Sequence, residues 1–209
     1  IDEWFAAISQ GHFVDEAREI RYADDMVFVF KSMTDAVRFY RVLDKRLNKY
    51  GIELHREKSQ LLPAGTAAAA RVNTEGKRIP TFKFLGFVCY WGLAKSKKFW
   101  RLKLKSRGDR KGVKLKGLRE FLRDNLNTPD TAGVVRRVNA GVRGWVTYHA
   151  ISDNLRAVSS FIMASARILF NWFNRRGRKR TMNWKRFQRL LAAIKFPKVP
   201  RPVILYPTP

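Results

Sequence analysis

Cysteine is almost absent from this chain of 209 residues, and what is missing excludes several classes of protein. Cys89 is the single cysteine, so the chain holds no internal disulfide framework and no multi-cysteine zinc site. No apolar run reaches the roughly 18 residues of a membrane-spanning helix. No signal peptide opens the sequence, which starts at Ile1 and not at Met. We therefore expect a fragment whose natural chain extends upstream of Ile1.

Acidic residues are scarce, and the scarcity is uneven along the chain. Lys and Arg number 43 against 17 Asp and Glu, a formal net charge of +26 at pH 7. Residues 1–92 hold 14 basic and 12 acidic residues, whereas residues 93–209 hold 29 and five. A basic excess interleaved with Trp and Phe favours a nucleic-acid partner over a merely solvated charged face. The shift in composition predicts a domain boundary within 93–110.

The apolar periodicity predicts an α+β fold. Helical spacing over 1–10 ends at Gly11, and a second helix over 34–50 is capped by Ser32 or Thr34 and ends at Gly51. Strands are predicted as a hairpin over 20–30 and over 52–55, 59–62, 82–91 and 99–105, with a loop over 63–80. Beyond residue 110 the spacing predicts four helices, over 111–126, 134–149, 155–173 and 184–194, before an extended Pro-rich tail.

Two adjacent carboxylates, Asp24 and Asp25, lie at the turn of the predicted hairpin between apolar strands. Like charges this close raise each other's pKa unless a cation offsets them, and Mg²⁺ does so while bridging to substrate phosphates. Two-metal nucleotidyl transfer needs such a carboxylate cluster. Asp is also a common turn residue, so a bare Asp-Asp pair is more often only a turn. The run Tyr22-Ala23-Asp24-Asp25 between apolar strands shifts the balance toward catalysis.

This tetrapeptide resembles the catalytic palm hairpin of reverse transcriptases, and further motifs follow in the same order. Residues 51–59 are similar to the next polymerase motif, whose lysine lies near the incoming nucleotide. Phe84-Leu85-Gly86 resembles the segment that closes the palm and grips the primer end. Residues 1–5 resemble the helix that precedes the hairpin in group II intron reverse transcriptases.

The basic half continues the resemblance. Residues 112–195 are similar to the thumb, or domain X, of group II intron maturases, through Asn139, Arg143-Gly144-Trp145 and Tyr148. The resemblance implies the end of a palm, an antiparallel sheet with a helix, over 1–92. A connecting strand or linker at 93–110, a helical thumb or maturase domain at 111–196 and a tail at 197–209 would follow.

For the site, the resemblance implies that Asp24 and Asp25 are catalytic and hold Mg²⁺, with two ions in the complete centre. The family's further aspartate, on an earlier palm strand, would lie upstream of Ile1, as would the fingers. Lys58 would donate a proton to pyrophosphate, unless it is a surface lysine beside a turn. Tyr22 and Ala23 would lie near the primer terminus, and Phe84, Leu85 and Gly86 would position the primer, unless they form only a core strand with a bulge.

The basic residues offer candidates for RNA phosphate contacts, which need charge more than fixed geometry. Trp145 is expected in the core more than as a base-stacking platform, and His12, His55 and His149 have no metal-ligand spacing. The candidate RNA-binding residues are Arg136, Arg137, Arg143, Arg175, Arg176, Arg178, Lys179, Arg180, Lys185 and Arg186.

Taken together, the resemblance implies an RNA-directed DNA polymerase and intron-RNA-binding maturase of a mobile group II intron, acting in splicing and retrohoming. Its partners would be intron and template RNA, a DNA primer and dNTPs, in a cytoplasmic ribonucleoprotein, bacterial or organellar, with no membrane; the oligomeric state stays open. Residues 1–209 alone would be inactive. Two alternatives remain: a related reverse transcriptase recruited to CRISPR spacer acquisition or defence, and a non-catalytic RNA-binding splicing factor, against which the paired aspartates argue.

Overall fold

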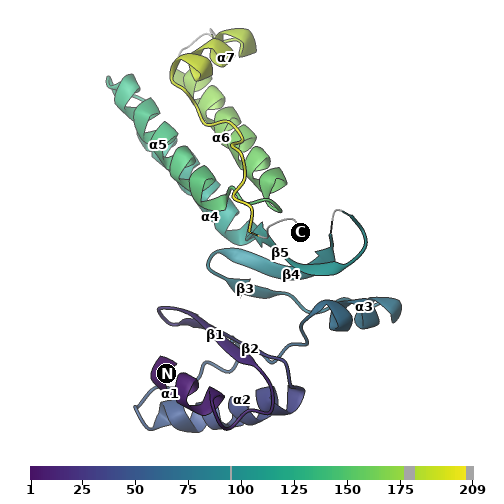
Figure 1. Cartoon of the computed structure of the whole chain (residues 1–209). Helices are drawn as coiled ribbons and strands as arrows, with labels where there is room; N and C mark the ends of the chain where they lie inside the picture. The colour runs from purple at the N-terminus through teal and green to yellow at the C-terminus, as the bar shows by residue number, and fades with distance from the viewer. Residues whose placement is uncertain (95, 177–181, 206–209) are drawn as a thin grey trace. The chain divides into compact units, whose positions relative to one another are not determined.

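The computed structural model describes residues 1–94, 96–176 and 182–205, and the chain divides into two compact units (Figure 1). The first unit comprises Ile1–Pro80 and Leu93–Arg101, and the second comprises Thr81–Gly92 and Leu102–Pro209. In the described part, seven helices accompany a two-stranded and a three-stranded sheet, so the predicted α+β class is confirmed. The boundary at 93–110 was inferred from charge and stays a prediction. None of the described helices is both long and apolar enough to cross a membrane.

In the first unit, β1 (Ala17–Tyr22) and β2 (Asp25–Phe30) form the antiparallel hairpin that the sequence predicts. The pair Tyr22↔Asp25 closes the ladder and leaves Ala23 and Asp24 as a two-residue turn. Ala23 has a φ of 51°, in the left-handed region that tight two-residue hairpin turns require. The turn therefore carries Asp24, and Asp25 opens β2.

Helices α1 (Asp2–Ser9) and α2 (Met33–Asn48) pack on one face of this hairpin through a cluster of aromatic rings. The ring centroid of Phe5 lies 5.1 Å from that of Phe28 and 5.4 Å from that of Phe39. Because side chains alternate along a strand, the register places Tyr22 and Asp25 on the face opposite this cluster. Packing of the two helices thus determines that the Asp25 carboxylate lies on the opposite face of the hairpin.

Two expectations for the segment after α2 are wrong. Residues 52–55 and 59–62 form no strand, because an apolar alternation forms a ladder only beside a partner, and β1 and β2 pair with each other. The predicted loop 63–80 contains α3 (Thr66–Thr74), which starts after Gly65 with its φ of 99°. The alanines 67–70 have the highest helix propensity of any residue and outweigh the flanking Gly and Pro signals.

The second unit begins with the sheet β3 (Phe82–Phe84), β4 (Phe87–Leu93) and β5 (Trp100–Ser106), in that order. The end of β4 at Leu93 and the start of β5 at Trp100–Arg101 are counted with the first unit. A two-residue turn joins β3 to β4, with φ values of 45° at Leu85 and 78° at Gly86. The predicted strand pair with a bend at Gly86 is confirmed.

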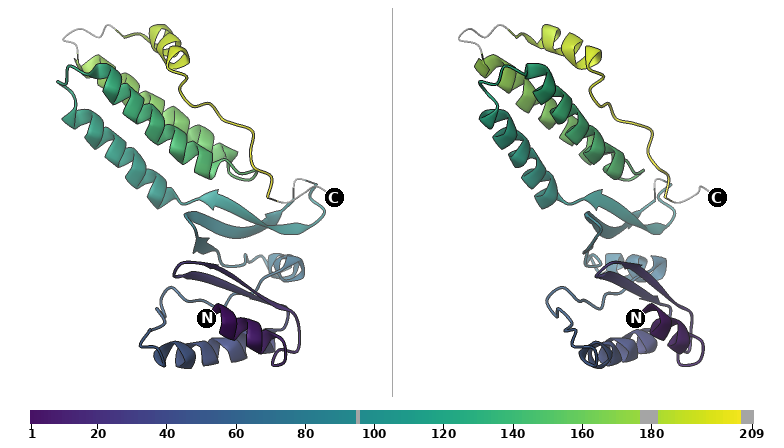
Figure 2. Two further views of the ribbon diagram at one scale, coloured as in Figure 1. Left: turned by 60° about the vertical axis from the view of Figure 1, so that its left-hand side comes forward. Right: turned by 90° about the vertical axis from the view of Figure 1, so that its left-hand side faces the viewer.

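Four helices follow, close to their predicted positions: α4 (Gly108–Asp124), α5 (Thr131–His149), α6 (Leu155–Arg176) and α7 (Trp184–Ala193). Figure 2 shows α4, α5 and α6 side by side. Buried valines recur every four residues along α5, at 134, 138, 142 and 146, and face the shared core. The tail returns to the end of α5, where the Val203 N–H donates to the Ala150 carbonyl at 2.8 Å.

Candidate functional site

The hairpin turn presents the two predicted catalytic carboxylates to solvent. Asp24 and Asp25 are both exposed, and neither carboxylate makes a hydrogen bond or ion pair with any residue that the structure describes. Beside them, Tyr22 is 66% exposed, and Arg21 is instead paired with Asp2 at 2.7 Å. Unpaired carboxylates at a fixed turn leave all four oxygens available for a cation.

Carboxylate oxygens of this kind fit Mg²⁺, which proteins usually bind through one or two carboxylates, with waters and substrate phosphates completing the octahedron. Among the described residues, no group of three or more His, Cys, Asp or Glu gathers as a metal site. Asp24 and Asp25 could thus offer two ligands, and among the described residues no third carboxylate joins them.

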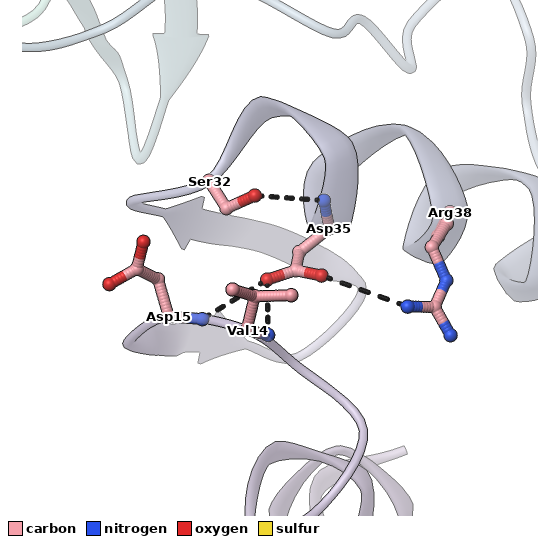
Figure 3. Close-up of polar contacts among 5 residues, drawn as sticks. All are labelled: Val14, Asp15, Ser32, Asp35 and Arg38. Atoms are coloured by element: carbon pink, nitrogen blue, oxygen red, sulfur yellow. Dashed lines mark hydrogen bonds and ion pairs between the residues drawn. The ribbon is translucent and has the colours of Figure 1, made fainter.

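Asp35, a residue that the sequence analysis missed, holds the opposite end of the hairpin (Figure 3). Its carboxylate is 1% exposed and accepts hydrogen bonds from the backbone N–H groups of Val14 at 2.7 Å and Asp15 at 3.3 Å. The Asp35 N–H in turn donates to the Ser32 hydroxyl at 3.3 Å, while Arg38 lies 4.0 Å from the carboxylate. The chain entering β1 and the chain leaving β2 are thereby tied together.

Glu19, the acidic residue of β1, lies on the helix-facing side of the hairpin. The pKa of Glu19 is raised, first by burial and then by a hydrogen bond with Asp2. Because Asp2 also pairs with Arg21, the start of α1 is anchored to β1 by these groups. Lys58, the predicted proton donor, is exposed in a turn closed by its N–H to the His55 carbonyl at 3.0 Å. No contact joins its ammonium group to the hairpin within the described residues.

In the second unit, the predicted primer-positioning turn at Leu85 and Gly86 is held by hydrogen bonds that its two backbone carbonyls accept. The Tyr148 hydroxyl donates to the Leu85 carbonyl at 2.8 Å, and the Arg107 N–H donates to the Gly86 carbonyl at 3.2 Å. The N–H groups of Leu85 and Gly86 have no acceptor in the portion of the chain described. With both carbonyls occupied, the turn offers two hydrogen-bond donors, which suits an anionic group. Phe84 is half-buried in β3.

The same corner is packed by the end of α5. The Tyr148 ring stacks on Phe87 with a centroid distance of 5.7 Å, and His149 stacks on Trp145 at 4.0 Å. Burial lowers the pKa of His149, although the hydrogen bond from its Nδ1 to the Trp145 carbonyl at 2.9 Å acts in the opposite direction. Trp145 also stacks on Phe161 at 3.9 Å, which confirms its predicted place against the core.

Asn154 joins this corner to the sheet. Its side chain is 1% exposed, accepts from the Ser106 N–H at 2.8 Å and donates to the His149 carbonyl at 2.9 Å. Neither Tyr148 nor Asn154 was assigned a role from the sequence, because Leu85 and Ser106, their partners in the sheet region, lie 63 and 48 positions away along the chain. The Asp24–Asp25 hairpin belongs to the first unit, and the Leu85–Gly86 turn belongs to the second.

The predicted RNA-binding residues divide by what they contact. Arg136, Arg175 and Lys185 are exposed and make no hydrogen bond or ion pair with a described residue. The Arg137 guanidinium lies 5.0 Å from the centroid of the Phe121 ring, and Arg143 donates to the Lys195 carbonyl at 3.4 Å. Arg186, also exposed, donates its backbone N–H to the Asn183 side chain, which caps α7. Three further candidates, Arg178, Lys179 and Arg180, lie outside the described residues.

Arg176 has a contact set unlike the others. Its guanidinium donates to the carbonyls of Asn125, Leu126 and Thr128, at 3.4, 2.9 and 2.7 Å, and lies 4.8 Å from the Trp172 ring centroid. These carbonyls follow the last turn of α4 and have no partner within that helix. Arg176 thus links the end of α6 to the end of α4.

Comparison with known proteins adds one result to this geometry. Residues 1–89 match the family model of reverse transcriptases (RNA-dependent DNA polymerases), a span that includes the carboxylate hairpin, α2 and the Leu85–Gly86 turn. This match covers less than half of the chain and makes residues 1–89 similar to reverse transcriptases. No curated protein and no solved structure matches the chain.

Proposed function

We propose that the protein is an RNA-directed DNA polymerase and intron-RNA-binding maturase of a mobile group II intron. Its first part would take part in DNA synthesis on an RNA template, with dNTPs and a DNA primer as substrates. Its basic second part would bind the intron RNA and assist splicing and retrohoming. We place it in a cytoplasmic ribonucleoprotein.

One observation carries this proposal: two adjacent, solvent-exposed and unpaired carboxylates, Asp24 in the two-residue turn and Asp25 at the start of β2, inside the segment that matches reverse transcriptases. A purely RNA-binding protein gains nothing from paired carboxylates, because they repel phosphate. In the proposed reaction Asp24 and Asp25 would hold Mg²⁺, which when bound would supply activation of the primer hydroxyl and charge neutralisation at the pyrophosphate. Lys58 is the proposed proton donor to pyrophosphate, and Tyr22 and Ala23 lie beside the primer terminus.

The maturase half of the proposal is supported by the net positive charge of residues 93–209 and by the second unit, where Tyr148 of α5 holds the Leu85–Gly86 turn. Backbone donors of this turn would contact the primer, and Phe84 would pack behind them. Arg136, Arg137, Arg143, Arg175, Lys185 and Arg186 are the proposed phosphate contacts among described residues.

The test of catalysis uses residues 1–209 joined to an upstream palm segment that supplies the third carboxylate. We expect this longer protein to extend a primer on an RNA template. Asp24→Asn or Asp25→Asn should abolish extension and leave RNA affinity nearly unchanged, measured on the same preparations by gel and by filter retention. Asp15→Asn, which alters another exposed carboxylate of the first unit, is the matched control. Retained extension in both variants would refute the metal-site assignment.

The maturase role has a separate test. The intron RNA that surrounds the gene is transcribed and its splicing is followed with and without the longer protein at low Mg²⁺. Faster splicing with the Asp24→Asn protein as well as with the unaltered one is expected, because RNA binding does not use the carboxylates. Extension without any effect on splicing would favour a reverse transcriptase recruited to another role.

A further inference from the structure

A pocket of about 160 Å³ opens between the C-terminal halves of α4 and α6 in the second unit. Its floor is apolar, made by Leu122, Leu126 and Ile168, whereas its other residues carry hydrogen-bond donors. These are Arg119, Arg123, Asn171, Trp172 and Arg175, and no Asp or Glu lines the pocket. Pockets for drug-sized ligands are usually about 300–1,000 Å³, so this one suits a single small group.

Positive charge in this pocket is poorly compensated. Arg119 and Arg175 make no hydrogen bond or ion pair with the described residues, and Arg123 has only an exposed contact with Asp124 at 3.5 Å. Arg119 and Arg123 are also four residues apart on one helix, a spacing at which like charges destabilise the helix. An anion among the three guanidinium groups would offset both effects.

A buried donor at the same place lacks an acceptor. Trp172 is 3% exposed, and its indole N–H has no hydrogen-bond partner in the structure. Buried donors without partners are rare, because each loses its hydrogen bond to water on folding. Asn171, one residue earlier, also makes no hydrogen bond with a described residue. Every polar side chain of the pocket is therefore a donor without a strong internal acceptor.

Arginines at helix ends have a simpler explanation, since cations are favoured near a helix C-terminus. Here that role is already filled by Arg176, which donates to three carbonyls beyond the end of α4. Arg119 lies more than a turn before the end of α4, and its guanidinium donates to no carbonyl of a described residue. The helix dipole therefore does not account for the group of three.

We propose that this pocket binds a phosphate group, supplied by the backbone of the bound RNA. Phosphate matches the planar donor fork of arginine, and a backbone phosphate needs no more room than the pocket has. The RNA source rests on the proposed function, whereas the affinity for phosphate depends on the pocket alone. Arg119 and Arg123, which the sequence analysis did not single out, thereby join Arg175 as RNA-contacting residues.

The first experiment titrates the 209-residue chain with inorganic phosphate and follows the indole N–H resonances by NMR. The Trp172 resonance, assigned by its loss in Trp172→Phe, is expected to shift with saturation, and Arg119→Gln with Arg123→Gln should abolish the shift. Arg156→Gln with Arg167→Gln, which removes the same charge from exposed positions of α6 outside the pocket, should leave it intact. A Trp172 resonance that never moves, or moves equally in all variants, would overturn the pocket.

The second experiment identifies the source of the phosphate. Phosphate-ethylation interference on a structured intron RNA should reveal positions that block binding, and one of them should disappear in Arg119→Gln with Arg123→Gln but persist in the Arg156/Arg167 control. Each lost phosphate contact should lower the slope of log affinity against log salt by about one unit. An unchanged interference pattern, with phosphate still binding, would overturn the RNA source and leave free phosphate as the ligand. Failure of the unaltered chain to bind any RNA would instead refute the proposed function.

Discussion

His149 is a residue whose charged form opposes folding of the second unit. Burial lowers its pKa below the 6.5 of an exposed histidine, so the neutral ring is favoured in the folded state. The stability that this preference contributes is present above pH 6.5 and is lost as the pH falls through the folded pKa. We expect the free energy of unfolding, measured by urea titration with circular dichroism, to fall as the pH is lowered from 6.5 through the folded pKa.

His149→Gln is the matched variant, because glutamine keeps a donor for the Trp145 carbonyl and does not titrate. Its stability should be nearly independent of pH across this window. A variant that lost stability as steeply as the unaltered chain would assign the pH dependence to another group.

For single residues, the sequence indicated positions that depend on neighbouring residues, but it did not indicate contacts with residues far away along the chain. Asp24 and Asp25 could be placed at the turn end of the hairpin because its position follows from the two flanking apolar runs, and the structure puts Asp24 in the turn and Asp25 at the start of β2. Asp35 was missed because its acceptor role depends on Val14 and Asp15, some 20 positions earlier. Ser32 followed three residues later by Asp35 resembles a capping pattern and was the one available signal.

Among the helices and strands, the link between α6 and α4 makes a prediction about Arg176. Arg176→Met keeps an apolar stem beside Trp172 but leaves the carbonyls of Asn125, Leu126 and Thr128 without their donor. We expect a loss of about 2 kcal/mol in the free energy of unfolding, the range of a hydrogen bond to a charged group. Urea titration measures it, with Arg175→Met as the control, since Arg175 makes no such contact.

The same pair of variants separates structure from RNA binding. Arg175→Met should weaken RNA binding without loss of stability, whereas Arg176→Met should do the reverse at temperatures where it stays folded. If Arg176→Met left stability unchanged and weakened RNA binding as much as Arg175→Met, the capping role would be wrong.

Long helices were the elements most open to sequence reasoning. In α5 and α6 an apolar stripe repeats over five or six turns, so periodicity and burial agree. The predictions of strands over 52–55 and 59–62 were wrong, because a strand forms only with a partner strand, and a local sequence pattern does not identify that partner. The predicted loop over 63–80 was wrong about α3, because the Gly and Pro signals were weighed above the intrinsic helix propensity of the alanines. The sequence alone did not show that Arg119 and Arg123 line a pocket, because the third arginine, Arg175, comes from a different helix, α6.

For the whole molecule, the uneven charge is the feature with the largest expected effect. The near-neutral first 92 residues include the proposed catalytic hairpin, whereas the excess of cations lies in residues 93–209. RNA binding should therefore depend steeply on salt, because each neutralised phosphate releases condensed counterions. If about 6–10 phosphates are contacted, affinity for structured RNA should fall roughly 10³–10⁵-fold between about 50 and 200 mM salt.

Two triple variants with the same loss of charge locate this binding. Arg136, Arg137 and Lys185 are exposed in the second unit, and Arg41, Lys45 and Lys49 are exposed on α2 and its C-cap in the first. Changing the former three to Gln should lower the slope of log affinity against log salt by about two to three units, because each proposed phosphate contact contributes roughly 0.7–0.9. The α2 triple variant should leave the slope unchanged, because these three residues make no proposed phosphate contact. A long-range effect of net charge would instead change the slope equally in both variants. Equal slopes in the two variants would show that binding follows total charge and not the surface of the second unit.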